Sequence, residues 1–510
     1  MSADNFYITT PIFYVNDVPH IGHAYTSIAC DVMARFMRLN GTSVKFLTGT
    51  DEHGQKVSES AAKKNITPQE FTDKNSAVFH QMMDMLNISN DDFIRTTENR
   101  HKEAVHALWQ KLKQNGDIYL GKYAGWYSVR DEAFYSEKEL TPDGLAPTGA
   151  PVEWVEESSY FFALSKWQDK LLDYYANNRH FIKPESRYNE VISFVKNGLT
   201  DLSISRTSFK WGIEVPEDKE HVIYVWLDAL TNYISALGYP DKTDEYAKFW
   251  PVAAHVIGKD ILRFHAIYWP AFLMAADLEL PKSIVAHGWW TNEGQKISKS
   301  IGNVIDPLKL VEEFGLDQTR YFLMREVTFG SDGNFSRESL ITRSNSELAN
   351  KIGNLLQRTS SFVFKNCDGA IPQISSDQLN DIYNSSIIME ILSMHQQNIK
   401  AMENFQINIV LENIIKITDL GNILIDKEAP WSLKNTDPER MLIILYTILE
   451  TMRYIGIMLQ PFIPDSAEKI LDQLGVNPHE RSFSNLTKEF ALQPSSPLKQ
   501  PIPIFPRIDK

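Results

Sequence analysis

The feature that most constrains the fold of this chain lies near its start, where a strand-like run leads through a histidine-containing loop into a helical pattern. Phe6–Thr10 has the composition of a β-strand, and the loop that follows contains His20 and His23. Apolar residues then recur every four positions from Ile28 to Phe36, before an Asn-Gly stop signal. A strand, a loop and a helix in this order predict the first unit of an open, parallel α/β sheet.

Changes in residue pattern along the sequence divide the chain into five expected segments. Strand and helix patterns alternate in residues 1–115 and resume in 201–275, which predicts two halves of one Rossmann-like parallel-sheet domain. Between them, residues 116–200 are rich in turn and aromatic residues and predict an inserted subdomain of short strands. Residues 276–345 contain a second charged loop. Residues 346–510 carry long amphipathic runs, which predict an all-α bundle with an extended tail.

Two further runs predict strands of the first domain. Val44–Thr48 ends at an acidic turn that contains Asp51, and Val222–Trp226 is rich in β-branched and aromatic residues. Open parallel sheets place their ligands at the carboxyl ends of strands. We therefore expect Asp51 to lie at a binding site, although an acidic residue at a strand end can also simply form a turn.

The composition excludes several classes of protein. A formal net charge of −14 argues against nonspecific coating of nucleic acid, although a local basic patch can still bind RNA. The two cysteines, Cys30 and Cys367, can build neither a disulfide framework nor a multi-cysteine zinc site. We see no apolar run of the ~18–20 residues that a membrane span needs, and no signal-peptide pattern. We therefore expect a cytoplasmic protein with no membrane contact.

A second motif complements the first. Two histidines three residues apart are, in isolation, more often core residues, surface residues or metal ligands. Here Gly22 between them allows a ligand to approach the backbone closely. Far along the chain, after a glycine-containing turn, residues 296–300 read Lys-Ile-Ser-Lys-Ser. Imidazoles at a helix N-terminus together with lysine ammonium groups suit the α-phosphate of ATP and a departing pyrophosphate.

These two motifs resemble the HIGH and KMSKS signatures of class I aminoacyl-tRNA synthetases. The first is an unaltered match, and the second has Ile297 where methionine is commoner. Four flanking segments resemble methionyl-tRNA synthetases specifically: Thr10–Asn16, Thr48–Gly54, Tyr224–Ala229 and Gly258–His265. The resemblance is continuous over roughly residues 6–360 and is recognisable into the C-terminal bundle. It implies a ligase that activates L-methionine with Mg²⁺-ATP to methionyl-adenylate and pyrophosphate. The methionine then moves to the 3′ end of tRNA(Met), including the initiator tRNA.

The resemblance also implies the residues that bind ATP. His20 and His23 would stabilise the transition state at the α-phosphate. Lys296 and Lys299, chiefly the latter, would hold the β- and γ-phosphates. Three further ATP-binding positions are implied, with the Asp260 carboxylate accepting from the ribose hydroxyls: Gly22, Gly258 and Asp260.

The methionine pocket is implied in the same way. Asp51 would take the substrate ammonium group as a charge-assisted hydrogen bond. Arg206 matches a family arginine close to the substrates, although a surface arginine in a salt bridge is an open alternative. An aromatic, mostly apolar cup would hold the thioether, whose contacts with rings contribute ~0.3–1.5 kcal/mol. Simple core packing remains an alternative for the tryptophan of that cup, which comprises Ile12, Tyr14, Trp226, Ala229, Tyr233, Ile261 and His265.

The helical segment carries residues that resemble the anticodon contacts of the family. Single-stranded RNA bases stack on aromatic side chains and hydrogen-bond to amides and guanidinium groups. Trp431 would therefore stack, while Asn354 and Arg358, four apart on one helix face, would bind base edges. For a tryptophan after Ala-Pro, an aromatic cap on the bundle is the alternative.

Two absences shape the remaining expectations. Related enzymes often carry cysteine-based zinc knuckles in the inserted subdomain, but the corresponding loops here contain neither cysteine nor histidine. Because tetrahedral zinc needs four such donors, we expect no structural zinc. Aromatic residues such as Trp126 and Trp154 would replace the metal. We see no appended RNA-binding barrel of the kind some relatives use to dimerise, so we expect a monomer.

Other functions fit the sequence less well. Isoleucyl, valyl and leucyl enzymes usually need a large editing insertion, and the insert here is too small. A cysteinyl enzyme needs a zinc-bound thiol pocket, which Cys30 and Cys367 cannot form. A small-molecule nucleotidyltransferase that shares the histidine motif has no use for the long helical segment. A non-enzymatic RNA-binding or scaffold protein is expected to carry a damaged motif, and both motifs here are intact.

Overall fold

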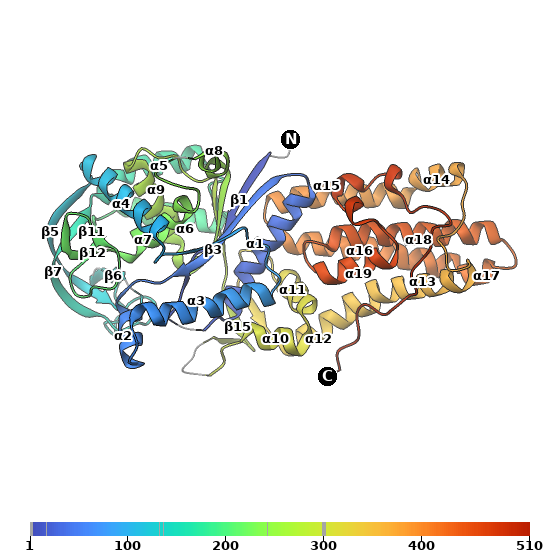
Figure 1. Ribbon diagram of the computed structural model, residues 1–510, viewed down its shortest axis with the longest axis horizontal. Helices are drawn as coiled ribbons and strands as arrows, with labels where there is room; N and C mark the ends of the chain where they lie inside the picture. Colours follow the sequence, from blue (N-terminus) through green and yellow to red (C-terminus); the bar gives the residue numbers. More distant parts are fainter. Residues whose placement is uncertain are drawn as a thin grey trace.

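The computed structural model describes residues 4–16, 18–131, 133–135, 137–241, 243–297 and 302–509. Within these ranges it describes all side chains except those of Tyr123, Ala133, Phe134, Glu157 and Lys296. An α/β part occupies one end of the elongated molecule and a bundle of long helices the other (Figure 1). Helices α1 and α11 lie between the two parts.

A seven-stranded parallel sheet organises the α/β part. Six strands run in the order β2-β3-β1-β13-β14-β8, and β4 pairs with β3. The central strands are almost wholly buried, as expected when helices cover both faces of a parallel sheet. This arrangement confirms the Rossmann-like prediction. The strands are β1 (Asn5–Thr9), β2 (Phe13–Tyr14), β3 (Ser43–Asp51), β4 (Asp92–Arg95), β8 (Ile182–Lys183), β13 (Ala253–Gly258) and β14 (Ser283–His287).

Helix α1 (Ile21–Leu39) begins directly after His20 and contains the predicted helical run from Ile28 to Phe36. His20 is the N-cap, so its ring satisfies a backbone N–H that the helix itself cannot. The other helices of this part are α2 (Gln55–Lys63), α3 (Pro68–Met85), α4 (Asn99–Gln114), α5 (Gln168–Asn177), α6 (Glu185–Lys196), α7 (Val225–Ser235), α8 (Asp244–Phe249), α9 (Trp269–Ala275), α10 (Pro307–Phe314), α11 (Leu316–Arg325) and α12 (Arg337–Arg343).

An antiparallel sheet of four strands forms most of the inserted subdomain. Its long central pair is β5 (Ile118–Ser128) and β7 (Glu153–Phe162), flanked by β6 (Ala133–Tyr135) and β9 (Leu202–Ser203). Trp126 lies opposite Trp154 in this pair, and their rings meet edge to face at 5.3 Å. The expected aromatic packing is therefore present at these two positions.

Two smaller sheets contain the other strands of the described residues. One contains β10 (Ser205–Arg206), β11 (Glu214–Val215) and β12 (Asp218–Ile223), and the other contains β15 (Trp290–Asn292), β16 (Gln295–Lys296) and β17 (Gly333–Phe335). The strand predicted at 222–226 is wrong in its second half, because β12 ends at Ile223 and α7 begins at Val225. The apolar residues of α7 are buried around most of the helix, so their β-type composition reflects burial rather than strand geometry.

The remaining described residues form long helices followed by an extended tail, as predicted. Helix α18 is apolar and long enough to cross a membrane, but 89% of its apolar window is buried inside the bundle, so it is a core helix. The tail returns along the bundle, where Ile508 and Asn345 exchange two hydrogen bonds of 2.9 Å (Figure 1). The elements are the π-helical η6 (Ser344–Gly353), α13 (Asn354–Asn366), α14 (Ser376–Tyr383), α15 (Ser386–Glu403), α16 (Ile407–Glu428), α17 (Pro430–Leu433), α18 (Pro438–Leu459) and α19 (Pro464–Gln473).

Candidate active site

The two histidines of the first motif form a stacked pair at the N-terminus of α1. Their ring centroids are 3.8 Å apart, and the His23 ring also packs edge-on against Phe13 at 4.9 Å and Phe79 at 5.3 Å. Burial lowers the pKa of His20, against the opposing charge of Asp260. Burial lowers the pKa of His23 further, and the neighbouring His20 ring adds to this effect. Both imidazoles are therefore neutral at pH 7.

Hydrogen bonds identify which nitrogen carries the proton in each ring. The Gly22 N–H donates to His20 Nδ1 at 3.1 Å, and the His20 N–H donates to His23 Nδ1 at 3.1 Å. A nitrogen that accepts a hydrogen bond cannot hold the proton of a neutral imidazole. Both rings therefore carry their proton on Nε2, which leaves two neutral N–H donors at the helix N-terminus.

Glycine at position 22 is a steric requirement of this arrangement. A Cβ atom on Gly22 would lie 3.0 Å from His20 Cε1 and 3.1 Å from His20 Nδ1. A side chain there would push the His20 ring away from the backbone N–H that it caps. Gly22 thus supports the predicted phosphate site through its lack of a side chain.

The predicted ribose-binding turn follows the carboxyl end of β13. Asp260 Oδ1 accepts a hydrogen bond from Trp289 Nε1 at 3.1 Å, and a Cβ on Gly258 would lie only 2.5 Å from the same oxygen. The Asp260 charge also affects the pKa of His20 and His287, so the turn lies beside the first motif. Sequence reasoning missed Trp289, which is 46% exposed. The available signal was its place in a pair of adjacent tryptophans shortly before the second motif.

The second motif lies largely outside the described residues. Lys296 contributes its backbone to β16, but its side chain lies outside them, as does all of Lys299. The flanking residues are described. Asn292 Nδ2 donates to the Asn303 carbonyl at 2.9 Å, and the Ile21 N–H donates to the Ile305 carbonyl at 3.0 Å. The chain that leaves the second motif therefore contacts the first turn of α1.

A second cluster of predicted residues surrounds His265. Its Nδ1 lies 3.0 Å from the Ile261 carbonyl, which can only accept, so Nδ1 carries the proton. Its Nε2 then accepts from the Tyr233 hydroxyl at 2.7 Å. Burial lowers the pKa of His265 to about 4, so the ring is neutral. Trp226 stacks on Phe264 with 3.7 Å between ring centroids, and its ring lies 6.1 Å from that of His265.

The remaining cup residues lie on neighbouring elements. Ala229 lies on α7 between Trp226 and Tyr233. Ile12 is partly buried against the same apolar cluster as Trp226. Tyr14 on β2 pairs in register with Asp51 at the end of β3, and the Val15 N–H donates to the Asp51 carbonyl at 3.2 Å.

Arg206 is buried rather than on the surface, at 2% exposure, so the alternative of a surface salt bridge is wrong. Its guanidinium donates to the Ser205 carbonyl at 2.6 Å and to Ser203 Oγ at 3.0 Å. The same group lies over the rings of Tyr127 at 5.4 Å and Tyr224 at 4.6 Å. Tyr224 directly precedes α7, so the arginine packs against the start of the helix that carries the aromatic cup.

A buried carboxylate on α7 was missed by the sequence analysis. Asp228 is fully buried and lies 2.6 Å from His53 Nδ1 and 2.7 Å from His101 Nε2. Burial opposes ionisation, but the two rings outweigh it and hold the pKa of Asp228 at about 2. His101 Nδ1 continues the network to Ser235 Oγ at 3.0 Å. No sequence signal joined these residues, because they are far apart in the chain.

The predicted RNA contacts lie in the helical bundle. Trp431 is 48% exposed, and the Arg358 guanidinium lies 5.7 Å from its ring centroid. Arg358 also forms an ion pair with Asp426 at 2.8 Å. Asn354 is exposed one turn earlier on α13. The exposed part of Trp431 leaves a surface on which a base could stack, and its role in RNA binding stays a prediction.

Comparison with known proteins decides the family. Residues 6–148 and 145–360 match the model "tRNA synthetases class I (M)", and residues 380–510 match "Anticodon binding domain of methionyl tRNA ligase". The methionine–tRNA ligase of Rickettsia bellii is 66% identical over 507 residues, which cover 99% of this chain and 100% of the relative. The methionine–tRNA ligase of Brucella suis is 55% identical over 511 residues, covering 99% and 98%. The chain belongs to the methionyl-tRNA synthetases.

Solved methionyl-tRNA synthetases share the same fold. The Mycobacterium tuberculosis enzyme in complex with methionyl-adenylate has a TM-score of 0.95 and 47% identity, covering 99% of this chain and 100% of that one. The free-state structure of the M. tuberculosis enzyme has a TM-score of 0.88 and 44% identity, covering 99% of each chain. This chain is thus more similar in shape to the adenylate complex.

This methionyl-tRNA synthetase holds no group of three or more histidine, cysteine, aspartate or glutamate side chains suited to a metal ion within its described residues. The expectation that it binds no structural zinc stays a prediction. The expected monomer and cytoplasmic location also stay predictions. The Asp260 charge affects the pKa of both His20 and His265, so the first motif, the Gly258–Asp260 turn and the cluster around His265 lie in one region. The roles of these residues in binding ATP and methionine stay predictions.

Proposed function

We propose that the chain ligates methionine to its tRNA in two steps at the site around His20, His265 and Asp260. Methionine first attacks the α-phosphate of ATP, giving methionyl-adenylate and pyrophosphate. The methionyl group then moves to the 3′-terminal ribose of tRNA(Met). The observation that carries this proposal is the full-length match to an enzyme solved with methionyl-adenylate.

The neutral histidines supply the first step with preorganised donors. His20 and His23 present Nε2–H groups at a helix N-terminus, where oriented backbone dipoles also favour negative charge. Charge that develops on the α-phosphate oxygens meets these donors without reorganisation of the site. Lys296 and Lys299 would neutralise the departing pyrophosphate, and Gly22, Gly258 and Asp260 would hold the nucleoside.

The aromatic cup supplies the preference for methionine. Asp51 would accept from the substrate ammonium group, and Trp226 with Phe264 would offer a flat aromatic wall to the thioether. The Tyr233 hydroxyl is already engaged by His265, so the polar atoms at the end of the cup are satisfied. Arg206, buried beside Tyr224, would hold the start of α7 in place.

Magnesium would enter with ATP. Mg²⁺ keeps several waters and is usually held by substrate phosphates with one or two carboxylates. The lack of a three-residue metal group among the described residues fits that mode of binding. When bound, the ion would neutralise charge on the phosphates.

The helical bundle would read the tRNA at a distance from this chemistry. Trp431 would stack on an anticodon base, and Asn354 and Arg358 would bind base edges in elongator and initiator tRNA alike. We propose the segment boundaries 1–115, 116–200, 201–275, 276–345 and 346–510 as the domains, and a cytoplasmic monomer as the working unit.

The test is ATP–pyrophosphate exchange with each of the twenty amino acids, followed by charging of tRNA(Met). We expect exchange with methionine far above all others. Lys299→Ala should reduce single-turnover adenylate formation by ~10²–10³, the usual loss for one transition-state donor. Exchange with another amino acid but not with methionine would exclude the proposed specificity, and an unchanged rate in the variant would remove Lys299 from catalysis.

A further inference from the structure

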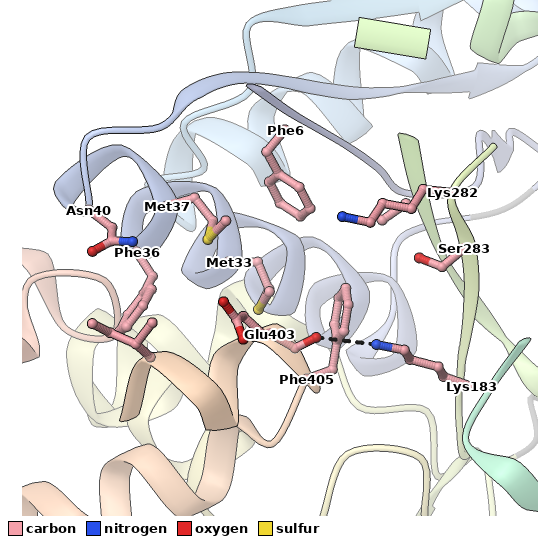
Figure 2. Close-up of a pocket in the computed structure, with 12 residues that line it drawn as sticks. Phe6, Met33, Phe36, Met37, Asn40, Lys183, Lys282, Ser283, Glu403 and Phe405 are labelled. Atoms are coloured by element: carbon pink, nitrogen blue, oxygen red, sulfur yellow. Dashed lines mark hydrogen bonds between the residues drawn. The ribbon is translucent and has the colours of Figure 1, made fainter. Parts of the chain in front are cut away.

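A cavity of about 290 Å³ lies at the junction of the α/β part and the helical bundle (Figure 2). Its walls come from the amino ends of β1, β13 and β14, the second half of α1, and the turn between α15 and α16. The catalytic residues lie at the carboxyl ends of these parallel strands. The cavity is therefore at the opposite ends of the strands from the aminoacylation site.

Most of the wall is apolar and adaptable. Phe6, Phe36 and Phe405 contribute rings, and Met33 and Met37 contribute thioethers from one face of α1. Methionine side chains adjust to irregular shapes and make favourable contacts with aromatic groups. The volume is at the lower end of the range for small-molecule pockets, which suits a compact ligand with an apolar body.

Two lysines give the cavity a positive end. Lys183 and Lys282 both extend toward the cavity, and the Lys183 ammonium donates to the Glu403 carbonyl at 3.2 Å (Figure 2). Neither ammonium has a carboxylate partner among the residues that the structure describes. Burial lowers the pKa of Lys183, the nearby Lys282 lowers it further, and Glu403 opposes both. A half-buried cation beside a second cation is stabilised by an anion.

The charge of the wall selects the charge of the ligand. The two lysines and the Glu403 carboxylate together carry one net positive charge. A monoanion would leave the site neutral, whereas a dianion would leave an excess negative charge and an uncharged molecule an excess positive one. Desolvating an unbalanced charge is costly, so the monoanion is favoured.

We propose that this cavity binds a small organic monoanion, a carboxylate with an apolar body, between the two parts of the molecule. The carboxylate contacts Lys183 and Lys282, and the apolar body lies against Met33, Met37 and the phenylalanine rings. The bound molecule thereby joins the sheet to the turn between α15 and α16. This inference does not depend on the proposed function, because the site uses none of the aminoacylation residues.

The test uses 4-phenylbutyrate as the probe and the full chain in calorimetric titration. The uncharged 4-phenylbutan-1-ol has the same shape, phenyl phosphate is a dianion at neutral pH, and acetate lacks the apolar body. We expect 4-phenylbutyrate to bind about tenfold or more tightly than each of the three, since one charged hydrogen bond accounts for roughly that factor. Equal binding of the alcohol would overturn the proposal.

Substitutions of the two lysines test whether 4-phenylbutyrate binds in this cavity. Lys282→Gln and Lys183→Gln should each weaken 4-phenylbutyrate binding by about tenfold. Lys282 is exposed, so its variant should fold normally even if the Lys183 variant does not. Lys196→Gln, at the exposed end of α6, is the matched control and should bind like the native chain. Unchanged affinity in Lys282→Gln contradicts the assignment.

Two further readouts separate this cavity from the methionine pocket, which also takes an amphipathic acid. Saturating methionine and ATP should leave 4-phenylbutyrate binding unchanged, and competition would place the probe in the active site instead. With [¹³C-methyl]methionine labelling, the Met33 and Met37 signals, assigned from Met33→Leu and Met37→Leu, should shift on titration. Shifts elsewhere but not at these two methyl groups would also overturn the proposal.

Discussion

At the scale of single residues, each active-site histidine has a partner that determines its tautomer. Backbone N–H groups occupy Nδ1 of His20 and His23, so both present Nε2–H, whereas the Ile261 carbonyl gives His265 the opposite tautomer. The Nε2–H groups of His20 and His23 are donors suited to a phosphate. The Nε2 of His265 is instead an acceptor for the Tyr233 hydroxyl. Identical side chains thus take different roles through single hydrogen bonds.

Asp228 offers a residue-scale prediction, because it ties α7 to the loop that follows Asp51. Asp228→Asn keeps the shape but loses the charge that holds His53 and His101. We expect the KM for methionine in pyrophosphate exchange to rise about tenfold, the usual effect of one charge-assisted hydrogen bond, with the KM for ATP unchanged.

The exposed Asp169→Asn is the control for this variant and should change neither constant. Asp228→Glu should recover less than the native affinity, because the longer side chain does not fit the same two rings. If both KM values rise equally in Asp228→Asn, the carboxylate supports the whole fold rather than the methionine pocket.

At the scale of elements, α1 carries three functions along one helix. Its N-terminus holds the histidines of the first motif, its middle holds the buried Asp31, and its C-terminal half lines the cavity at the domain junction. In the bundle, the corner between α13 and α17 presents Trp431 with Arg358 above its ring. In both cases the residues with an expected or proposed role lie at a helix end or on one face of a helix.

Trp431→Ala should raise the KM for tRNA in the charging reaction, because stacking on an aromatic side chain contributes ~1–3 kcal/mol per base. Pyrophosphate exchange, which needs no tRNA, should be unchanged. Trp431→Phe keeps an aromatic face and should lose less. Similar losses in exchange and charging would instead indicate misfolding of the bundle.

Helix α15 leads to a prediction about acid stability. His395 is buried against the Phe483 ring at 4.8 Å, and burial lowers its pKa to about 4. In the unfolded chain a histidine has a pKa near 6.5, so the unfolded state binds more protons between these values. Stability therefore falls as pH drops below about 6.5, and the loss is complete near pH 4.

His395→Phe keeps a ring and removes the titration. Between pH 7 and pH 5 the native chain should lose about 2 kcal/mol more free energy of unfolding than this variant, measured by urea denaturation. His479→Gln, at an exposed position, should retain the native pH dependence. A pH dependence that His395→Phe leaves unchanged would assign the acid loss to other groups.

At the scale of the whole molecule, one apolar core continues from the sheet into the helical bundle. Phe6 and Ile8 face this core, whereas Tyr7 faces the separate core on the other side of the sheet, as alternation along a strand requires. Arg320 lies at the junction, fully buried, and pairs with Asp31 at 2.6 Å. It also donates to the carbonyls of Leu86, Pro461 and Phe462.

Arg320→Met should lower the free energy of unfolding by about 3–5 kcal/mol, because it leaves buried carbonyls and a buried carboxylate with fewer donors. Arg35→Met is the matched control, since Arg35 contacts the same Asp31 carboxylate from a side chain that is 22% exposed. Its loss should be smaller than that of Arg320→Met, because water can reach part of the site that Arg35 leaves. Equal losses of the free energy of unfolding, measured by urea denaturation, would show that the full burial of Arg320 does not strengthen its contacts at the junction.

Local patterns gave reliable predictions in this chain. The strand, loop and helix around His20 and the helical runs after residue 346 follow from periodicity, capping and turn residues that act within a few positions. The error at Val222–Trp226 arose where burial on all sides removed the difference between strand and helix patterns.

The order of elements and the two motifs follow from the amino-acid sequence alone. Folding brings Asp228 to His53 and His101, places Arg320 between the two parts and buries Arg206. The contacts of Asp228 and Arg320 join residues far apart in the chain, and burial together with two neighbouring rings sets the pKa of Asp228. Neither property exists until the chain has folded, because both are set by which segments exclude water from one another.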